Sequence, residues 1–94
     1  MTTISCLTAR RLGLDIERPR RWRHLMGIDG QSQRVPVVDP GRGVIGSLVA
    51  PLSEVVVTDL LAVFRADGLL GLDVLQHFRV TWEFDICCLV LRPL

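Results

Sequence analysis

The sequence predicts a small, mainly β domain with one or two short helices, on the basis of three local patterns. Apolar and polar residues alternate from Phe78 to Phe84, which is typical of a strand with one buried face and one exposed face. Residues 54–58 are mostly β-branched and indicate a strand covered on both faces. Asp29-Gly30 separates two strand-like segments and favours a two-residue type I′ hairpin turn. Sheet structure should therefore dominate the fold.

Length and composition indicate one domain that associates with a second copy of itself. A chain of 94 residues buries only about 60 to 65% of its unfolded surface in a single core. No repeat or linker divides it, so residues 1–94 are expected to form one domain. Apolar residues make up 49% of the chain, and the mean hydropathy of +0.38 is high for a soluble monomer. We therefore expect a homodimer.

Charge does not favour nucleic-acid binding. The formal net charge is only +1, and all eleven basic residues are arginines. Residues 18–23 form a basic segment with one tryptophan, a pattern that can contact phosphates and stack on bases. A charged run this short is more often a solvated face, and no known nucleic-acid motif accompanies it.

The cysteines favour a reducing, cytoplasmic compartment. There are three of them, Cys6, Cys87 and Cys88, with no CxxC spacing and no signal peptide, so a disulfide framework is not expected. Neither His24 nor His77 has the spacing from these thiols that a metal site requires, and we expect no metal and no cofactor. The longest uncharged run, residues 43–53, is too short to span a bilayer, which takes about 20 apolar residues.

The first part of the chain predicts a helix and then a hairpin. Ser5 is suited to cap a helix over residues 6–12, with Gly13 ending it and with Leu7 and Leu12 pointing inward. Residues 21–28 and 31–38 are the two strands of the hairpin around Asp29-Gly30.

The middle of the chain alternates turns with short strands. Residues 39–43 form a turn cluster, residues 44–50 a strand, and residues 54–58 the strand covered on both faces. Residues 60–64 are ambiguous between a helical turn and a loop that packs its leucines. Asp67-Gly68 then turns the chain.

The C-terminal part predicts a short helix and a terminal hairpin. The helix follows Gly71, with an apolar face of Leu72, Leu75 and Phe78. The first strand of the terminal hairpin should bury Phe78, Val80, Trp82 and Phe84. A turn at 85–87 and a second strand at 88–91 complete the hairpin before Pro93.

This C-terminal part resembles a known family. Leu-Leu-Gly-Leu-Asp-Val-Leu at 69–75, then Phe-Arg-Val-Thr at 78–81 and an acidic, aromatic turn, is similar to the C-terminal half of retropepsin-like aspartic peptidases, above all the small bacterial aspartyl protease domains. The likeness is strongest over 67–84 and extends upstream to Thr2. It implies an acid-protease-like barrel, and a homodimer in which each subunit supplies one catalytic aspartate.

The resemblance also implies roles for two groups of residues. The hairpin corresponds to the flap that closes over a bound extended peptide, and its tip would contact that peptide through Gly27, Ile28, Asp29, Gly30 and Gln31. An ordinary surface hairpin without a ligand explains the same dipeptide equally well. Gly71 and Asp73 correspond to structural residues of the family motif, with Asp73 near the start of the terminal helix.

The family's catalytic motif is absent from the sequence. Retropepsin-like domains carry Asp-Thr-Gly or Asp-Ser-Gly just before a segment like residues 3–5, and neither tripeptide occurs in these 94 residues. Asp67-Gly68 and Asp29-Gly30 lack the hydroxyl residue between aspartate and glycine and fit turns better. The chemistry needs two carboxylates about 3 Å apart that share one proton. We therefore expect a domain truncated at its N-terminus, with no catalytic residue and no peptide hydrolysis; the alternative is a non-catalytic peptide-binding or dimerisation module of the same fold.

Overall fold

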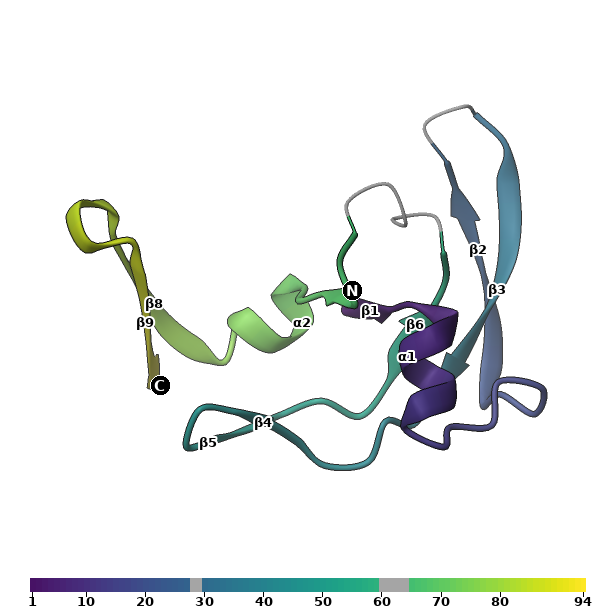
Figure 1. Ribbon diagram of the computed structural model, residues 1–94, viewed down its shortest axis with the longest axis horizontal. Coiled ribbons are helices and arrows are strands. Elements are labelled where there is room, and N and C mark those ends of the chain that lie inside the picture. Colours follow the sequence, from purple (N-terminus) through teal and green to yellow (C-terminus); the bar gives the residue numbers. More distant parts are fainter. Residues whose placement is uncertain (28–29, 60–64) are drawn as a thin grey trace.

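The computed structural model describes residues 1–27, 30–59 and 65–94 (Figure 1). These described ranges contain two short helices, α1 (Cys6–Arg11) and α2 (Leu72–Leu75), and a 3-10 turn, η2 (Phe84–Ile86). The strands are β1 (Thr3–Ile4), β2 (Arg21–Met26), β3 (Ser32–Val38), β4 (Gly43–Ile45), β5 (Leu48–Ala50), β6 (Val55–Val57), β7 (Gly68–Leu69), β8 (Phe78–Glu83) and β9 (Cys88–Pro93). The fold is mainly β with short helices, as predicted.

The described strands form three separate sheets and no closed barrel. A five-stranded sheet has the order β2-β3-β6-β1-β7, while β4-β5 and β8-β9 each form a two-stranded sheet. β1 lies inside the large sheet, parallel to β6 and antiparallel to β7. The expectation of a barrel is therefore not met in the single chain, because β8 and β9 pair with each other instead of with the five-stranded sheet.

The core is built on β6, as the β-branched run at 54–58 predicts. All three valines of β6 are buried. Val55 and Val57 pack with Ala9 of α1 and Val38, while Val56 packs on the opposite face with valines of β3. Successive strand residues point to opposite faces, so a strand covered on both sides must be apolar at every position.

Helix α1 begins where the capping signal predicts, but it buries a different face. The Ser5 hydroxyl accepts a hydrogen bond from the Thr8 amide at 3.1 Å, and Gly13 has a φ of +74°. The prediction that Leu7 and Leu12 point inward is wrong, because they are 57% and 63% exposed. The helix packs through the small side chain of Ala9 instead, since its contact face is only one or two residues wide.

The hairpin of β2 and β3 is confirmed, but its loop is longer than predicted. Met26 pairs with Ser32, and the Gly27 amide donates to the Gln31 carbonyl at 2.8 Å. A two-residue turn centred on Asp29-Gly30 would have residue 28 facing Gln31, so the loop holds three residues instead of two. Ile28 and Asp29 lie outside the described residues.

The single strand expected over residues 44–50 is in fact a small hairpin. β4 and β5 pair from Gly43 with Ala50 to Ile45 with Leu48. Gly46, with a φ of +60°, turns the chain between them. The turn cluster expected over residues 39–43 is shorter than predicted, because Gly43 already begins β4; within it the Gly41 amide donates to the Asp39 carboxylate at 2.9 Å. The expectation for residues 60–64 falls outside the described residues.

The C-terminal hairpin of β8 and β9 extends away from the five-stranded sheet (Figure 1). Phe78 at its base is 8% exposed, but Trp82 is 62% and Phe84 82% exposed. The predicted alternation therefore gives the right strand and the wrong burial, because the outer half of the hairpin has no described element packed on it. In α2 the buried residue is Val74, and the expected apolar contact of Leu72 is wrong. The 3-10 turn η2 and Cys87, in the left-handed region at φ 53°, form the turn expected at 85–87.

Candidate functional site

A hydrogen-bonded cluster joins Thr2, near the start of the chain, to Gly71 and Asp73, which are about 70 residues away. The Thr2 amide and the Thr2 hydroxyl both donate to Asp73 Oδ1, at 3.0 and 2.8 Å. The same Thr2 oxygen accepts a hydrogen bond from the Gly71 amide at 3.0 Å. Thr2 is only 5% exposed, so these bonds satisfy its polar atoms. The cluster ties the strand entry at Thr2 to the first turn of α2.

Gly71 is required by close approach and not by its dihedral angles. Its φ of −97° is open to any residue. A Cβ on Gly71 would lie 2.7 Å from Asp73 Oδ1, 2.7 Å from the Met1 carbonyl carbon and 2.8 Å from the Thr2 nitrogen. No side chain fits there unless the backbone moves. Gly71 and Asp73, the two residues singled out from the family motif, thus lie in one cluster.

The cluster keeps Asp73 ionised. Partial burial by itself would raise the pKa of Asp73, but hydrogen bonds from the hydroxyl and amide of Thr2 outweigh it, so the pKa lies below its ordinary value of 3.8. A general acid or base working near neutral pH needs a pKa close to that pH. This carboxylate is suited to holding backbone in place and poorly suited to carrying a proton.

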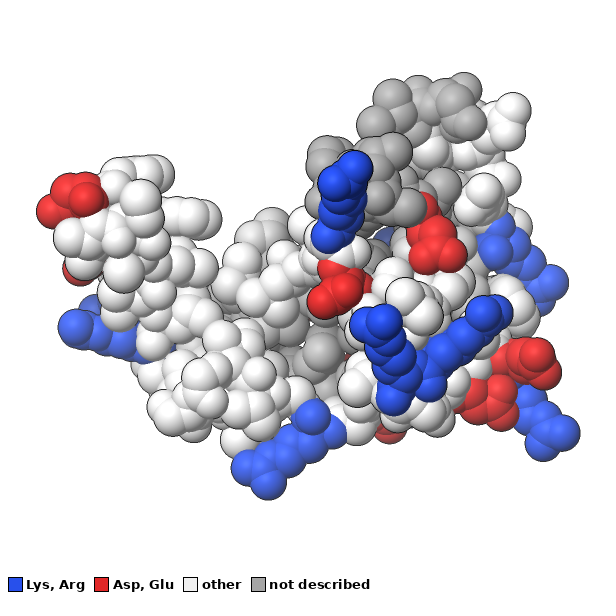
Figure 2. All heavy atoms as spheres, viewed as in Figure 1, with Lys and Arg blue, Asp and Glu red and all other residues white. Residues whose placement is uncertain are grey.

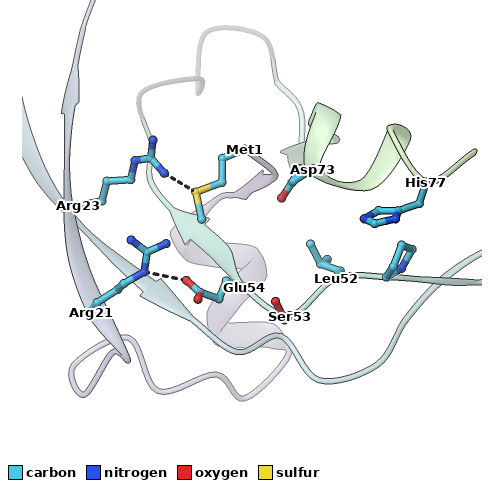
Figure 3. Close-up of a pocket in the computed structure, with 9 residues that line it drawn as sticks. Met1, Arg21, Arg23, Leu52, Ser53, Glu54, Asp73 and His77 are labelled. Carbon is cyan, nitrogen blue, oxygen red and sulfur yellow. Dashed lines mark hydrogen bonds and ion pairs between the residues drawn. The ribbon is translucent and has the colours of Figure 1, made fainter.

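A cavity of about 450 Å³ opens next to the cluster (Figure 3). Arg21 and Arg23 of β2 form one wall, and Asp73 and His77 lie across from them. The floor and rim are completed by Met1, Pro51, Leu52, Ser53 and Glu54. Arg21 Nε pairs with Glu54 Oε2 at 2.9 Å, and Arg23 Nη1 donates to the Met1 sulfur at 3.0 Å.

The flap-tip residues that the structure describes do not line this cavity. Among the five, Gly27, Gly30 and Gln31 are described, and they lie at the far end of the β2–β3 hairpin (Figure 1). Gly30 has a φ of +80°, and its amide donates to the Gly27 carbonyl at 3.0 Å. Ile28 and Asp29 fall outside the described residues.

Sequence reasoning missed the residues that give the cavity its charge. Arg21 and Arg23 lie two apart on a strand, and that spacing alone places both side chains on one face. Glu54 comes from a segment 33 residues away and joins Arg21 only through the pairing of β3 with β6. No local signal could have indicated that contact.

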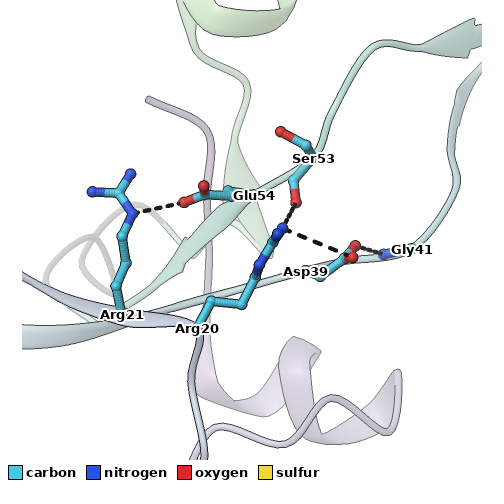
Figure 4. Close-up of polar contacts among 6 residues, drawn as sticks. All are labelled: Arg20, Arg21, Asp39, Gly41, Ser53 and Glu54. Atoms are coloured by element: carbon cyan, nitrogen blue, oxygen red, sulfur yellow. Dashed lines mark hydrogen bonds and ion pairs between the residues drawn. The ribbon is translucent and has the colours of Figure 1, made fainter.

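The basic segment 18–23 is largely engaged within the chain (Figure 4). Arg20 lies 3.9 Å from the Asp39 carboxylate and donates to the Ser53 carbonyl at 3.3 Å. The Arg34 guanidinium stacks 4.4 Å above the Trp22 ring, which occupies the one aromatic of the segment. Acidic and basic side chains are interspersed over the face seen in Figure 2, and no continuous basic patch is visible there.

The surroundings of Cys6 make it a poor nucleophile. Burial raises the pKa of the Cys6 thiol, and the neighbouring Asp59 carboxylate raises it further. Cys87 and Cys88 are exposed on the C-terminal hairpin, and all three thiols are free. In the part of the chain that the structure describes, no three His, Cys, Asp or Glu side chains gather as metal ligands.

Comparison with protein-family models, with curated proteins and with solved structures found no match to this chain. In the described ranges, no helix has the length and apolar character needed to cross a membrane.

Proposed function

We propose that the chain is a retropepsin-like aspartic peptidase domain which, as its sequence stands, lacks the catalytic Asp-Thr/Ser-Gly motif and does not hydrolyse peptides. The Thr2–Gly71–Asp73 cluster supports this most directly. It joins the segment that follows the catalytic turn in that family to the Leu-Leu-Gly-Leu-Asp motif, through bonds between residues about 70 positions apart. A site that depends on ångström-level placement of an aspartate needs such a rigid support.

The surroundings of β1 support the same proposal. β1 pairs with β6 on one side and β7 on the other, so its entry at Thr2 is held from both directions. An Asp-Thr-Gly turn placed before Met1 would lead directly into this fixed strand. In the proposed fold, the three sheets are parts of an acid-protease-like barrel.

The proposal includes a homodimer formed through the β8–β9 hairpin. A two-stranded hairpin alone in water is only marginally stable. Trp82 and Phe84 stack with ring centroids 6.2 Å apart, yet both rings are mainly exposed. A second copy would cover this surface, and a dyad of shared carboxylates requires one aspartate from each copy.

The test is to add the catalytic motif and to measure whether peptide cleavage appears. Adding Asp-Thr-Gly-Ala directly before Met1 should give weak cleavage of unfolded protein substrates at mildly acidic pH, inhibited by a pepstatin-type compound. The shared proton is lost as pH rises, so cleavage should fall toward neutral pH. Changing the added aspartate to asparagine should abolish it. Cleavage by the original chain that Asp73→Asn removes would overturn the proposal.

A second candidate is a non-catalytic peptide-binding module, and the position of β2 favours it. β2 lies at one edge of the five-stranded sheet and pairs with β3. An edge strand offers backbone N–H and C=O groups to an extended peptide, which can add as a further strand. Amide exchange of residues 21–26 should slow when an extended peptide binds; unchanged exchange at saturating peptide would exclude this mode.

A further inference from the structure

The arginine wall of the cavity holds a guanidinium, that of Arg23, which pairs with no carboxylate among the described residues. Arg21 and Arg23 point to the same face of β2, about 7 Å apart along the strand. Arg21 is paired with Glu54 at 2.9 Å. Arg23 Nη1 donates instead to the Met1 thioether, a weak acceptor, and neither ion pair found among the described residues involves Arg23. Arg23 is exposed, and apart from the Nη1 bond to Met1 its N–H donors are open to a ligand.

The wall opposite the arginines carries a hydrogen-bond acceptor, the Asp73 carboxylate, whose position is fixed. Asp73 is anchored by Thr2 through Oδ1, and its carboxylate faces the cavity in Figure 3. Glu54 adds a second carboxylate, already paired with Arg21. The charges of the two arginines and the two carboxylates balance one another, and the Met1 ammonium, which helps to lower the pKa of Asp73, adds one positive charge. A ligand with one negative charge matches this surplus better than one with several, such as a phosphate, and a bare cation is repelled by the arginines.

A ligand that fits must carry one carboxylate and at least one N–H donor. An acidic residue within an extended peptide has both, namely a side-chain carboxylate for Arg23 and backbone amides for acceptors across the cavity. The side chains of Leu52 and Pro51 line the same space and can contact the ligand's methylene groups. The volume of about 450 Å³ lies within the range of ligand pockets, about 300 to 1,000 Å³.

The sheet places such a peptide beside the cavity. A peptide added at the edge of β2 would turn every second side chain to the face on which Arg21 and Arg23 lie. We propose that this cavity is a specificity pocket that takes the carboxylate of an Asp or Glu residue in an extended peptide, with Arg23 as the group that binds it. The inference rests on the proposed function, in which the fold binds extended peptides.

The test compares two peptides and three proteins. The peptides are fluorescein-labelled nonapeptides of alternating Val and Thr, capped at their ends, with either Glu or Gln at the central position. The proteins are the full chain, Arg23→Gln, and the matched control Arg42→Gln, whose arginine lies in the exposed turn before β4 and outside the cavity. Fluorescence anisotropy gives the dissociation constants, and circular dichroism checks that each variant is folded.

The full chain should bind the Glu peptide about tenfold more tightly than the Gln peptide, the size expected for a charged hydrogen bond. Arg23→Gln should reduce this preference to about twofold or less, Arg42→Gln should keep it, and added salt should weaken it. Equal binding of both peptides by the full chain, or an unchanged preference in Arg23→Gln, would overturn the pocket while peptide binding stands. Binding of neither peptide would overturn the proposed peptide binding and, with it, the pocket.

Discussion

At the scale of single residues, the account depends on Asp73 and its bonds to Thr2. Replacing Asp73 by alanine removes two hydrogen bonds to a charged acceptor, and we expect a loss of about 2 to 3 kcal/mol in the free energy of unfolding. The control Asp85→Ala removes a carboxylate from the exposed turn of the C-terminal hairpin and should stay within about 0.5 kcal/mol of the original. Urea titrations measure both. Equal midpoints for the two variants would show that the cluster contributes nothing.

The pH dependence of stability tests the ionisation of Asp73. Its pKa in the folded protein is lower than 3.8, the ordinary value expected in the unfolded chain. Its contribution is therefore complete well above pH 3.8 and is lost as pH falls through the folded-state pKa. The difference in unfolding free energy between the original chain and Asp73→Asn should be constant from pH 7 to 5 and shrink below about pH 4. A difference that stays the same down to pH 2 would contradict the lowered pKa.

Gly71 gives a test of close packing at the same place. Gly71→Ala forces a Cβ to within 2.7 Å of the Asp73 carboxylate, so we expect a loss of about 1 to 3 kcal/mol in unfolding free energy. In Gly43→Ala the new Cβ would lie 3.4 Å from the Ala50 Cβ, an ordinary contact, and the effect should be much smaller. Thermal or urea denaturation distinguishes the two. A Gly71→Ala protein as stable as Gly43→Ala would mean that the backbone around Thr2 yields at no cost.

At the scale of elements, β6 carries the core. Val56 is 1% exposed between its neighbours in the sheet, whereas Val49 of β5 is 54% exposed. Removing two methyl groups from the core should cost about 2 kcal/mol in Val56→Ala, against less than about 0.5 kcal/mol in Val49→Ala. Denaturant midpoints for these two variants measure the difference. Similar losses would mean that β6 is not the centre of the core.

Elements with a local signal were predicted from the sequence, and those set by distant contacts were not. The Ser5 cap, the valines of β6 and the pairing of β2 with β3 are local, and all three are found. Residues 44–50 form two strands because Gly46 turns the chain at a positive φ. The short apolar run around Gly46 does not indicate that turn. The alternation of apolar and polar residues in β8 correctly predicts a strand, but a sequence pattern does not show whether another element covers Trp82.

The residues of the candidate site also divide into those indicated by the sequence and those that only the fold brings together. Gly71 and Asp73 were singled out by resemblance to a family motif, and the structure places them together with Thr2. Their partner Thr2 is 71 residues from Asp73, a contact that no local pattern specifies. The ion pair of the arginine wall could not be predicted from the sequence either, because Glu54 reaches Arg21 only across the sheet.

At the scale of the whole molecule, the exposed C-terminal hairpin predicts self-association. Trp82→Ala alone should change the stability of the isolated chain little, since its ring is 62% exposed. The double change Trp82→Ala and Phe84→Ala should instead weaken the dimer at least tenfold, because aromatic residues dominate the energetics of interfaces. Sedimentation velocity over a range of concentrations measures the dissociation constant of the dimer. A stable monomer at micromolar concentration, or a dimer unaffected by the double change, would contradict the assignment of this surface.

If the proposed function holds, two copies of this fold form one aspartic peptidase site once an Asp-Thr-Gly turn is added. The most direct measurement is a calorimetric titration of the chain extended by Asp-Thr-Gly-Ala before Met1 with a pepstatin-type inhibitor at mildly acidic pH. We expect one inhibitor bound per two chains, and no binding when the added aspartate is asparagine. A stoichiometry of one inhibitor per chain, or binding that survives the asparagine change, would contradict it.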